Sequence, residues 1–238
     1  MKKLALLFGF LLTTLAVHAQ TINVHKKSGE VIAYPLDDID FLDFSEEVSP
    51  VGPPESVEAV DLGLPSGTKW ANMNFGATKP EEYGGYYAYG ELEEKKVYSE
   101  ETWNWDDLYV NGRILSNIAF TKFDVVQAKW GGTWHLPTYQ QIRELVDNCN
   151  QKWTEENGVK GYRLTSMYNN KSIFFPAAGY KEFASLKQEG KELRYRLGEY
   201  HGGGCFGTYY TVYGTQAFGC ESLGFDVYFG GAVRAVKD

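Results

Sequence analysis

The segment around Thr138 restricts the fold more than any other part of the chain. Thr138 and Gln141, three residues apart, form a capping box, which is typical of the first turn of a helix. Apolar residues follow at helical spacing as far as Cys149, so one face of this helix is expected to pack on a core. Asp124 is expected to cap a second, shorter helix that ends at Trp130.

Short strands are expected in most of the remaining chain, because large flat side chains and glycines occur together. The sequence has 17 Tyr, 14 Phe, 6 Trp and 26 Gly, and folds with many short strands and tight turns use both kinds of residue. The expected strands cover residues 57–62, 68–75, 84–90, 161–166, 172–175, 193–197, 208–213, 225–229 and 232–236. Two helices with about eight short strands predict an α+β fold with a mainly antiparallel sheet.

The first 19 residues have the pattern of a secretory signal peptide. Lys2 and Lys3 precede an apolar run over residues 4–17, and cleavage is expected between Ala19 and Gln20. The run is short for a membrane-spanning helix, although a signal-anchor helix is the alternative, and no second long apolar segment follows. We therefore expect an exported chain, in the periplasm, on the outer surface or outside the cell, with no membrane span after signal removal.

Residues 20–47 are expected to form a separate N-terminal β-hairpin module. Two alternating strands flank a turn at Gly29, and acidic and apolar residues interleave over 35–44. That acidic run lacks the glycine of a calcium loop, so a solvated amphipathic strand or turn is the better interpretation. Residues 48–56 contain three prolines and predict a linker, and residues 57–238 form the main domain. A lone hairpin is marginally stable, so the module should dock on something.

The charge of the chain excludes one class of partner. Without Lys2 and Lys3, 21 basic residues face 31 acidic ones, a formal net charge of −10. An acidic surface of this size repels phosphate backbones, so nucleic acid is not an expected partner.

The three cysteines leave two interpretations open. Cys205 and Cys220 lie fifteen positions apart in a region of strands and turns, so a disulfide between them is possible in an exported chain. Cys149 lies on the apolar helix face and is expected to be buried. Three unpaired cysteines that act as small hydrophobic residues are the alternative.

Several motifs resemble the Fibrobacter succinogenes major paralogous domain, which is common in exported proteins of Bacteroidetes. The segment 60–71, Val-Asp-Leu-Gly-Leu-Pro-Ser-Gly-Thr-Lys-Trp-Ala, is similar to the opening of that domain. Further matches lie at residues 80–84, 90–91, 130–138, 147–149, 176–180 and 233–236. The Trp-x-Leu-Pro-Thr element also resembles the sulfatase-modifying-factor superfamily. That resemblance implies a C-type-lectin-like mixed fold whose two ends lie close together, while residues 208–213 depart from the family pattern.

The sequence shows no convincing catalytic, cofactor or metal site. The enzymatic branch of the superfamily uses closely spaced cysteines, and Cys205 and Cys220 lack that spacing. His25, His135 and His201 do not form a ligand pair at metal-binding spacing. The adjacent acids Glu93 and Glu94 should point apart rather than into one cleft. An enzyme of the sulfatase-modifying type therefore remains only an alternative.

The polar stretch between residues 91 and 121 holds the candidate ligand site. Trp103, Trp105 and Tyr109 are aromatic residues in a long loop, and such residues either contact a ligand or fold down on the sheet as a lid. Aromatic platforms suit sugar faces and protein contacts. We expect a non-catalytic binding module for a glycan or for an envelope or surface protein. A structural subunit of a surface assembly is the alternative, because the hairpin needs a docking partner.

Overall fold

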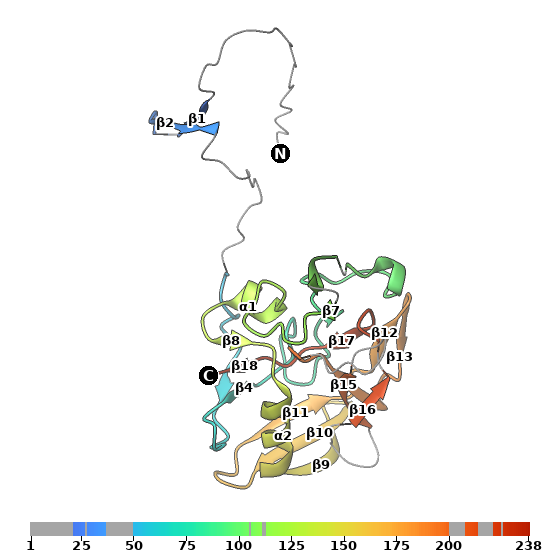
Figure 1. The fold of residues 1–238 in the computed structure, drawn as a ribbon. Coiled ribbons are helices and arrows are strands. Elements are labelled where there is room, and N and C mark those ends of the chain that lie inside the picture. The colour runs from blue at the N-terminus through green and yellow to red at the C-terminus, as the bar shows by residue number, and fades with distance from the viewer. Residues whose placement is uncertain are drawn as a thin grey trace. The chain divides into compact units, whose positions relative to one another are not determined.

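Two units, residues 1–47 and 48–238, make up the chain in the computed structural model (Figure 1). The structure describes residues 21–26, 28–36, 50–104, 106–110, 113–199, 208–213, 221–224 and 226–238. The predicted cleavage site at Ala19 and Gln20 lies outside these described residues. So do Trp105 and the two cysteines of the possible disulfide, Cys205 and Cys220.

The first unit contains the predicted β-hairpin. Strand β1 (Thr21–His25) pairs antiparallel with β2 (Val31–Pro35). The turn closes with a hydrogen bond from the Gly29 N–H to the carbonyl of Lys26 at 2.9 Å. Gly29 has a φ of 88°, a backbone conformation that glycine adopts without a steric penalty. The prediction of a hairpin in this region is confirmed.

Part of the predicted linker belongs to the second unit. The Val51 N–H donates to the Lys129 carbonyl at 3.0 Å, and a Cβ built at Gly131 would meet the ring of Pro50. The Val57 N–H closes a turn onto the Pro54 carbonyl at 2.9 Å. At Pro50 and Val51 the segment therefore contacts the end of helix α1 (Val125–Trp130) in the main unit.

A four-stranded sheet joins the two ends of the main unit. Its order is β3-β4-β18-β8, so the last strand lies between strands from the start and the middle of the unit. The strands are β3 (Ala59–Val60), β4 (Lys69–Ala71), β8 (Trp134–His135) and β18 (Val236–Lys237). Strands β3 and β4 are shorter than predicted, β18 shares only Val236 with the predicted strand 232–236, and β8 was not predicted.

A three-stranded antiparallel sheet, ordered β11-β10-β9, lies beside the second helix (Figure 1). Its strands are β9 (Cys149–Glu156), β10 (Val159–Ser166) and β11 (Ser172–Pro176). The hairpin of β10 and β11 was predicted. Strand β9 was not, because its polar residues carry little apolar alternation.

The largest sheet has the order β13-β12-β17-β14-β15-β16, and β5 pairs with β17. Only the pairing of β14 with β17 is parallel among its described strands. The strands are β5 (Tyr86–Tyr87), β12 (Tyr180–Glu182), β13 (Ser185–Lys187), β14 (Glu192–Tyr195), β15 (Thr208–Tyr213), β16 (Glu221–Gly224) and β17 (Gly230–Ala232). A small hairpin of β6 (Tyr109–Val110) and β7 (Arg113–Ile114) lies outside this sheet.

The two α-helices begin at the predicted caps. Helix α1 (Val125–Trp130) follows Asp124, whose carboxylate accepts two backbone N–H groups of the first turn. Helix α2 (Tyr139–Asn148) follows Thr138, and both hydrogen bonds of the capping box are present. One detail differs, because Cys149 ends α2 in an extended conformation and begins β9 rather than continuing the helix. Two short 3₁₀-helices, Glu100–Thr102 and Asp106–Leu108, lie between β5 and β6.

Aromatic side chains and a buried arginine form the centre of the main unit. The ring of Phe175 packs edge-on against Trp70 and Tyr195, with centroids 6.0 and 5.1 Å away. The guanidinium of Arg234, fully buried, lies 4.4 Å from the centroid of Phe175. The described residues therefore confirm an α+β fold with two α-helices and mainly antiparallel sheets. Its likeness to C-type lectins stays a prediction.

Candidate functional site

A cleft of about 470 Å³ lies beside the predicted ligand loop. Three segments meet there: the turn after β5, the stretch from Asn104 into the second 3₁₀-helix, and the residues that precede α1. The lining residues are Gly90, Glu91, Leu92, Glu93, Glu94, Lys95, Asn104, Asp107, Lys122 and Phe123. This volume falls within the range of about 300–1,000 Å³ that is usual for small-molecule sites.

The structure corrects the prediction for Trp103. Its side chain is only 8% exposed and belongs to the core, and its indole N–H donates to the Tyr89 carbonyl at 2.9 Å. Trp103 therefore folds down onto the core, which was the alternative to ligand contact. Tyr109, at 48% exposure, remains open to solvent on β6. The loop contributes Asn104 and Asp107 to the cleft instead.

Glu91 holds the loop together at the edge of the cleft. Its carboxylate pairs with the Lys95 ammonium at 2.8 Å and accepts the Asn104 backbone N–H at 3.0 Å. Lys95 also donates to the carbonyl of Thr102 at 3.0 Å. Because both ends of the Glu91–Lys95 pair are largely shielded from solvent, the pair fixes the loop more firmly than an exposed pair would.

The neighbouring acids Glu93 and Glu94 point to different partners, as their adjacency predicted. Glu93 contacts the Lys129 ammonium at 2.5 Å. Glu94 accepts the Tyr86 backbone N–H at 2.9 Å and lies 3.6 Å from Lys181. A glycosidase needs a carboxyl group that keeps its proton, which requires apolar surroundings or a second carboxylate. Each of these glutamates instead faces an ammonium group.

The cleft combines an apolar side with a polar rim. Leu92 and Phe123 are half-buried and pack against the core. The ammonium of Lys122 lies 5.0 Å from the Phe123 ring centroid. Asn104 and Asp107 are exposed at the rim and offer amide and carboxylate groups to a ligand. No sequence signal marked Phe123 or Lys122, because they come from a different part of the chain.

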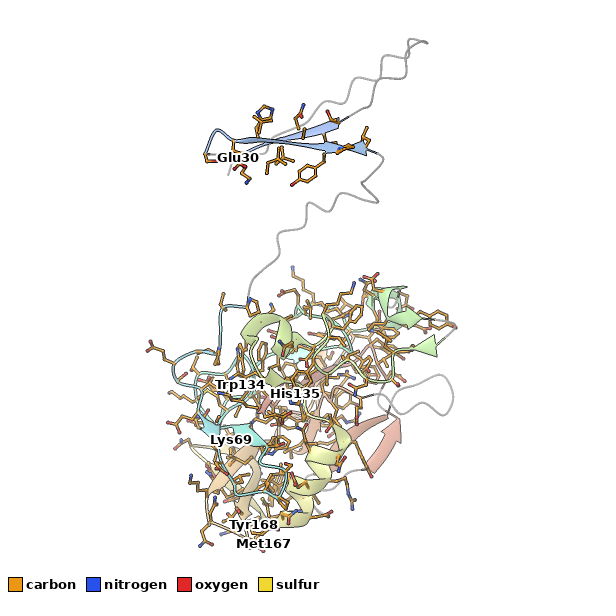
Figure 2. All side chains as sticks on the ribbon, turned by 60° about the vertical axis from the view of Figure 1, so that its left-hand side comes forward. Glu30, Lys69, Trp134, His135, Met167 and Tyr168 are labelled. Carbon is orange, nitrogen blue, oxygen red and sulfur yellow. The ribbon has the colours of Figure 1, made fainter. Side chains whose placement is uncertain are left out.

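A second, polar hollow of about 380 Å³ lies at the start of α2. Its polar groups bond mainly to one another, as the Ser66 hydroxyl does to Glu144 at 2.5 Å. Beside it, the buried imidazole of His135 has Nδ1 at 2.7 Å from the Leu136 carbonyl and Nε2 at 3.1 Å from the Asp238 carboxylate. Figure 2 shows His135 on β8 within the main unit. His135 is therefore a packed, hydrogen-bonded side chain, as its position before the helix cap predicted.

The described residues contain no cluster of three or more His, Cys, Asp and Glu side chains placed to hold a metal ion. Cys149 is a buried free thiol, and burial raises its pKa to about 11. A thiol of this kind is a poor nucleophile, because the thiolate is the reactive form. His201 and the remaining cysteines lie outside the described part of the chain.

Comparisons of the chain with protein-family models, with curated proteins and with solved structures find no match. The family stays a prediction from the sequence. None of the described helices is long and apolar enough to cross a membrane.

Proposed function

We propose that this protein is an exported, non-catalytic binding module and that the cleft takes a glycan. The observation that carries the proposal is the composition of the cleft. It joins the apolar surfaces of Leu92 and Phe123 to exposed hydrogen-bonding groups on Asn104 and Asp107. A sugar ring has an apolar face and many hydroxyl groups, so it needs both kinds of surface at once.

The charge of the lining favours neutral sugars over acidic ones. Four carboxylates and two lysines face the cleft, and the whole chain has a formal net charge of −8. Uronic-acid polymers would be repelled by such a lining, whereas neutral hydroxyl groups can donate hydrogen bonds to the carboxylates. The signal-peptide pattern supports a location outside the cytoplasm, where glycans are exposed. Mass spectrometry of secreted chain that begins at Gln20 would test that location.

Isothermal titration calorimetry of the purified protein with neutral and with acidic oligosaccharides tests the proposal. Replacement of Asn104 or Asp107 by Ala should weaken binding of a neutral oligosaccharide by about two- to tenfold, the loss of one hydrogen bond. Asp147→Ala is the matched control, because Asp147 is an exposed carboxylate on α2. If no glycan binds, or if all three variants bind like the wild type, the cleft is not a glycan site.

The hairpin supports a second candidate, a subunit of a surface assembly. Ile22 is paired with Tyr34, and Val24 with Ile32, so these four apolar side chains share one face of the hairpin. On that face the side chains of Val24 and Tyr34 are exposed, with exposed fractions of 43% and 45%. Light scattering should show a dimer, formed through this face, that is lost when residues 20–47 are deleted. A monomer at every concentration would count against this candidate.

A further inference from the structure

The carboxylate of Asp124 is fully buried and accepts hydrogen bonds from four backbone N–H groups. One oxygen accepts the Val126 and Gln127 N–H groups at 2.9 and 3.1 Å and so caps α1. The other oxygen accepts the Phe120 N–H at 3.1 Å and the Leu136 N–H at 2.9 Å. A helix cap needs only one side-chain oxygen, so the second oxygen has a separate role.

The second oxygen closes the loop of residues 120–124 on itself. Phe120 begins this loop and Asp124 ends it, so the hydrogen bond between them ties the two ends together. Inside the loop, the Thr121 hydroxyl accepts the Phe123 N–H at 3.2 Å. Phe120 has a φ of 61°, which bulky residues rarely adopt and which persists only where the surrounding structure holds it. The hydrogen bond to Asp124 supplies part of that hold.

The same oxygen attaches the loop to the body of the main unit. Leu136 directly follows β8 and is only 2% exposed, so it belongs to the core. The ring of Phe120 lies against the buried imidazole of His135 on β8, with ring centroids 3.9 Å apart. A ring contact and a hydrogen bond through Asp124 therefore both hold the loop against the end of β8.

The loop supplies one wall of the cleft. Lys122 and Phe123 both line the cleft, and Phe123 is the one aromatic side chain among the described lining residues. Its ring is half-buried and packs against the core, so the core fixes the position of the ring. The Lys122 ammonium lies 5.0 Å from the ring centroid, but such contacts are weak at exposed sites, so a ligand can displace it.

We propose that Phe123 is the surface on which a sugar ring stacks in the cleft, and that Asp124 is a positioning residue that fixes the loop 120–124 before the ligand arrives. This inference rests on the proposed glycan-binding function. An aromatic ring suits the apolar face of a sugar. A wall that is already ordered lowers the cost of binding, because fewer groups lose freedom when the ligand enters.

Asp124→Ser separates the helix cap from the positioning role. Serine caps helices about as well as aspartate, but its one oxygen cannot also accept the Phe120 and Leu136 N–H groups. Amide hydrogen exchange of the full chain, followed by NMR, should therefore be at least about tenfold faster at Phe120 and Leu136 in this variant. Exchange at Val126 and Gln127 should stay as slow as in the wild type.

Calorimetry with a neutral oligosaccharide measures the consequence for binding. Asp124→Ser should weaken binding by about two- to tenfold, because the loop must then be ordered by the ligand. Phe123→Leu keeps an apolar side chain on the core but removes the ring, and it should weaken binding by about three- to tenfold. Thr121→Val is a milder second variant of the same loop, for use if Asp124→Ser does not fold. It should speed exchange at Phe123 and weaken binding by about twofold.

Thr138→Ala is the matched control. It removes a capping hydroxyl from α2, and none of the described lining residues of the cleft belongs to that helix. The variant should be less stable than the wild type. Measured well below its melting temperature, its affinity for the oligosaccharide should equal that of the wild type, and exchange at Phe120 should be unchanged.

Several outcomes would overturn the inference. If Phe120 and Leu136 exchange as slowly in Asp124→Ser as in the wild type, Asp124 does not hold the loop. If they exchange faster and the oligosaccharide still binds equally well, the loop is held for the fold alone and the proposed function stands. Wild-type affinity in Phe123→Leu would show that the ring is no contact. If Thr138→Ala binds as weakly as Asp124→Ser, lost stability explains both. A wild type that binds no oligosaccharide removes the proposed function and this inference together.

Discussion

Replacement of the buried Arg234 tests the account of the core most directly. The guanidinium has three acceptors: the Asn74 amide oxygen at 2.9 Å, the Ala71 carbonyl at 3.1 Å and the Phe174 carbonyl at 2.7 Å. Ala71 is on β4 and Phe174 is on β11, so one side chain joins the four-stranded and three-stranded sheets. Arg234→Met keeps much of the volume and removes all five N–H donors.

The expected cost follows from the acceptors that the methionine leaves behind. Each buried polar group left without a partner costs about 1–3 kcal/mol, and three are affected here. Part of this cost is offset, because a guanidinium no longer has to be buried. We expect a loss of about 4 kcal/mol, a large share of the roughly 5–15 kcal/mol that stabilises a typical domain. For a unit of this size the melting temperature should fall by about 10 °C.

Denaturation in guanidinium chloride, followed by tryptophan fluorescence, measures the change in the free energy of unfolding. Fluorescence reports on this unit because Trp70, Trp130 and Trp134 are buried in it. Arg143→Met is the control: Arg143 lies on the exposed face of α2, 3.6 Å from Asp147, and its loss should cost less than about 0.5 kcal/mol. If Arg234→Met and Arg143→Met are equally stable, the cross-sheet role assigned to Arg234 is refuted.

Two further predictions concern local features of the main unit. Thr138→Ala removes the capping-box hydroxyl of α2 and should lower the free energy of unfolding by about 1 kcal/mol, measured by urea denaturation against Thr133→Ala. Burial raises the pKa of Tyr98 to about 12, so between pH 10 and 12 the unfolded chain loses this proton and the folded chain keeps it. Stability should therefore fall as pH rises through this window, by up to about 1.4 kcal/mol per pH unit for this group. Tyr98→Phe should show a shallower decline, and an identical slope in the two proteins would contradict the prediction.

Features that depend on a few neighbouring residues were predicted well. The caps at Asp124 and Thr138 are present, because a capping side chain needs only the backbone of the next turn. The hairpin of β10 and β11 follows from two apolar runs around the left-handed Asn170. Strand β9 escaped prediction, because its pairing with β10 rather than its own composition keeps it extended.

The candidate site was predicted only in part. The cleft borders the loop that the sequence offered as a ligand site, since Asn104 and Asp107 of that loop line it. The sequence could not tell that Trp103 turns inward, because that depends on a carbonyl acceptor at Tyr89, fourteen residues away. Nothing in the sequence indicated that Phe120 and Phe183 would be exposed and would have a positive φ. Phenylalanine is usually buried and usually has a negative φ.

The sequence by itself determined the fold class, the two helix starts and the separate hairpin, because each of these depends on contacts between residues close in the chain. Only the tertiary structure decided which side chains meet at the cleft and in the core. Glu93 pairs with Lys129, which is 36 positions away in the sequence, and Arg234 donates to Asn74, which is 160 positions away. Such pairs depend on how the sheets pack together, and no local pattern records that packing.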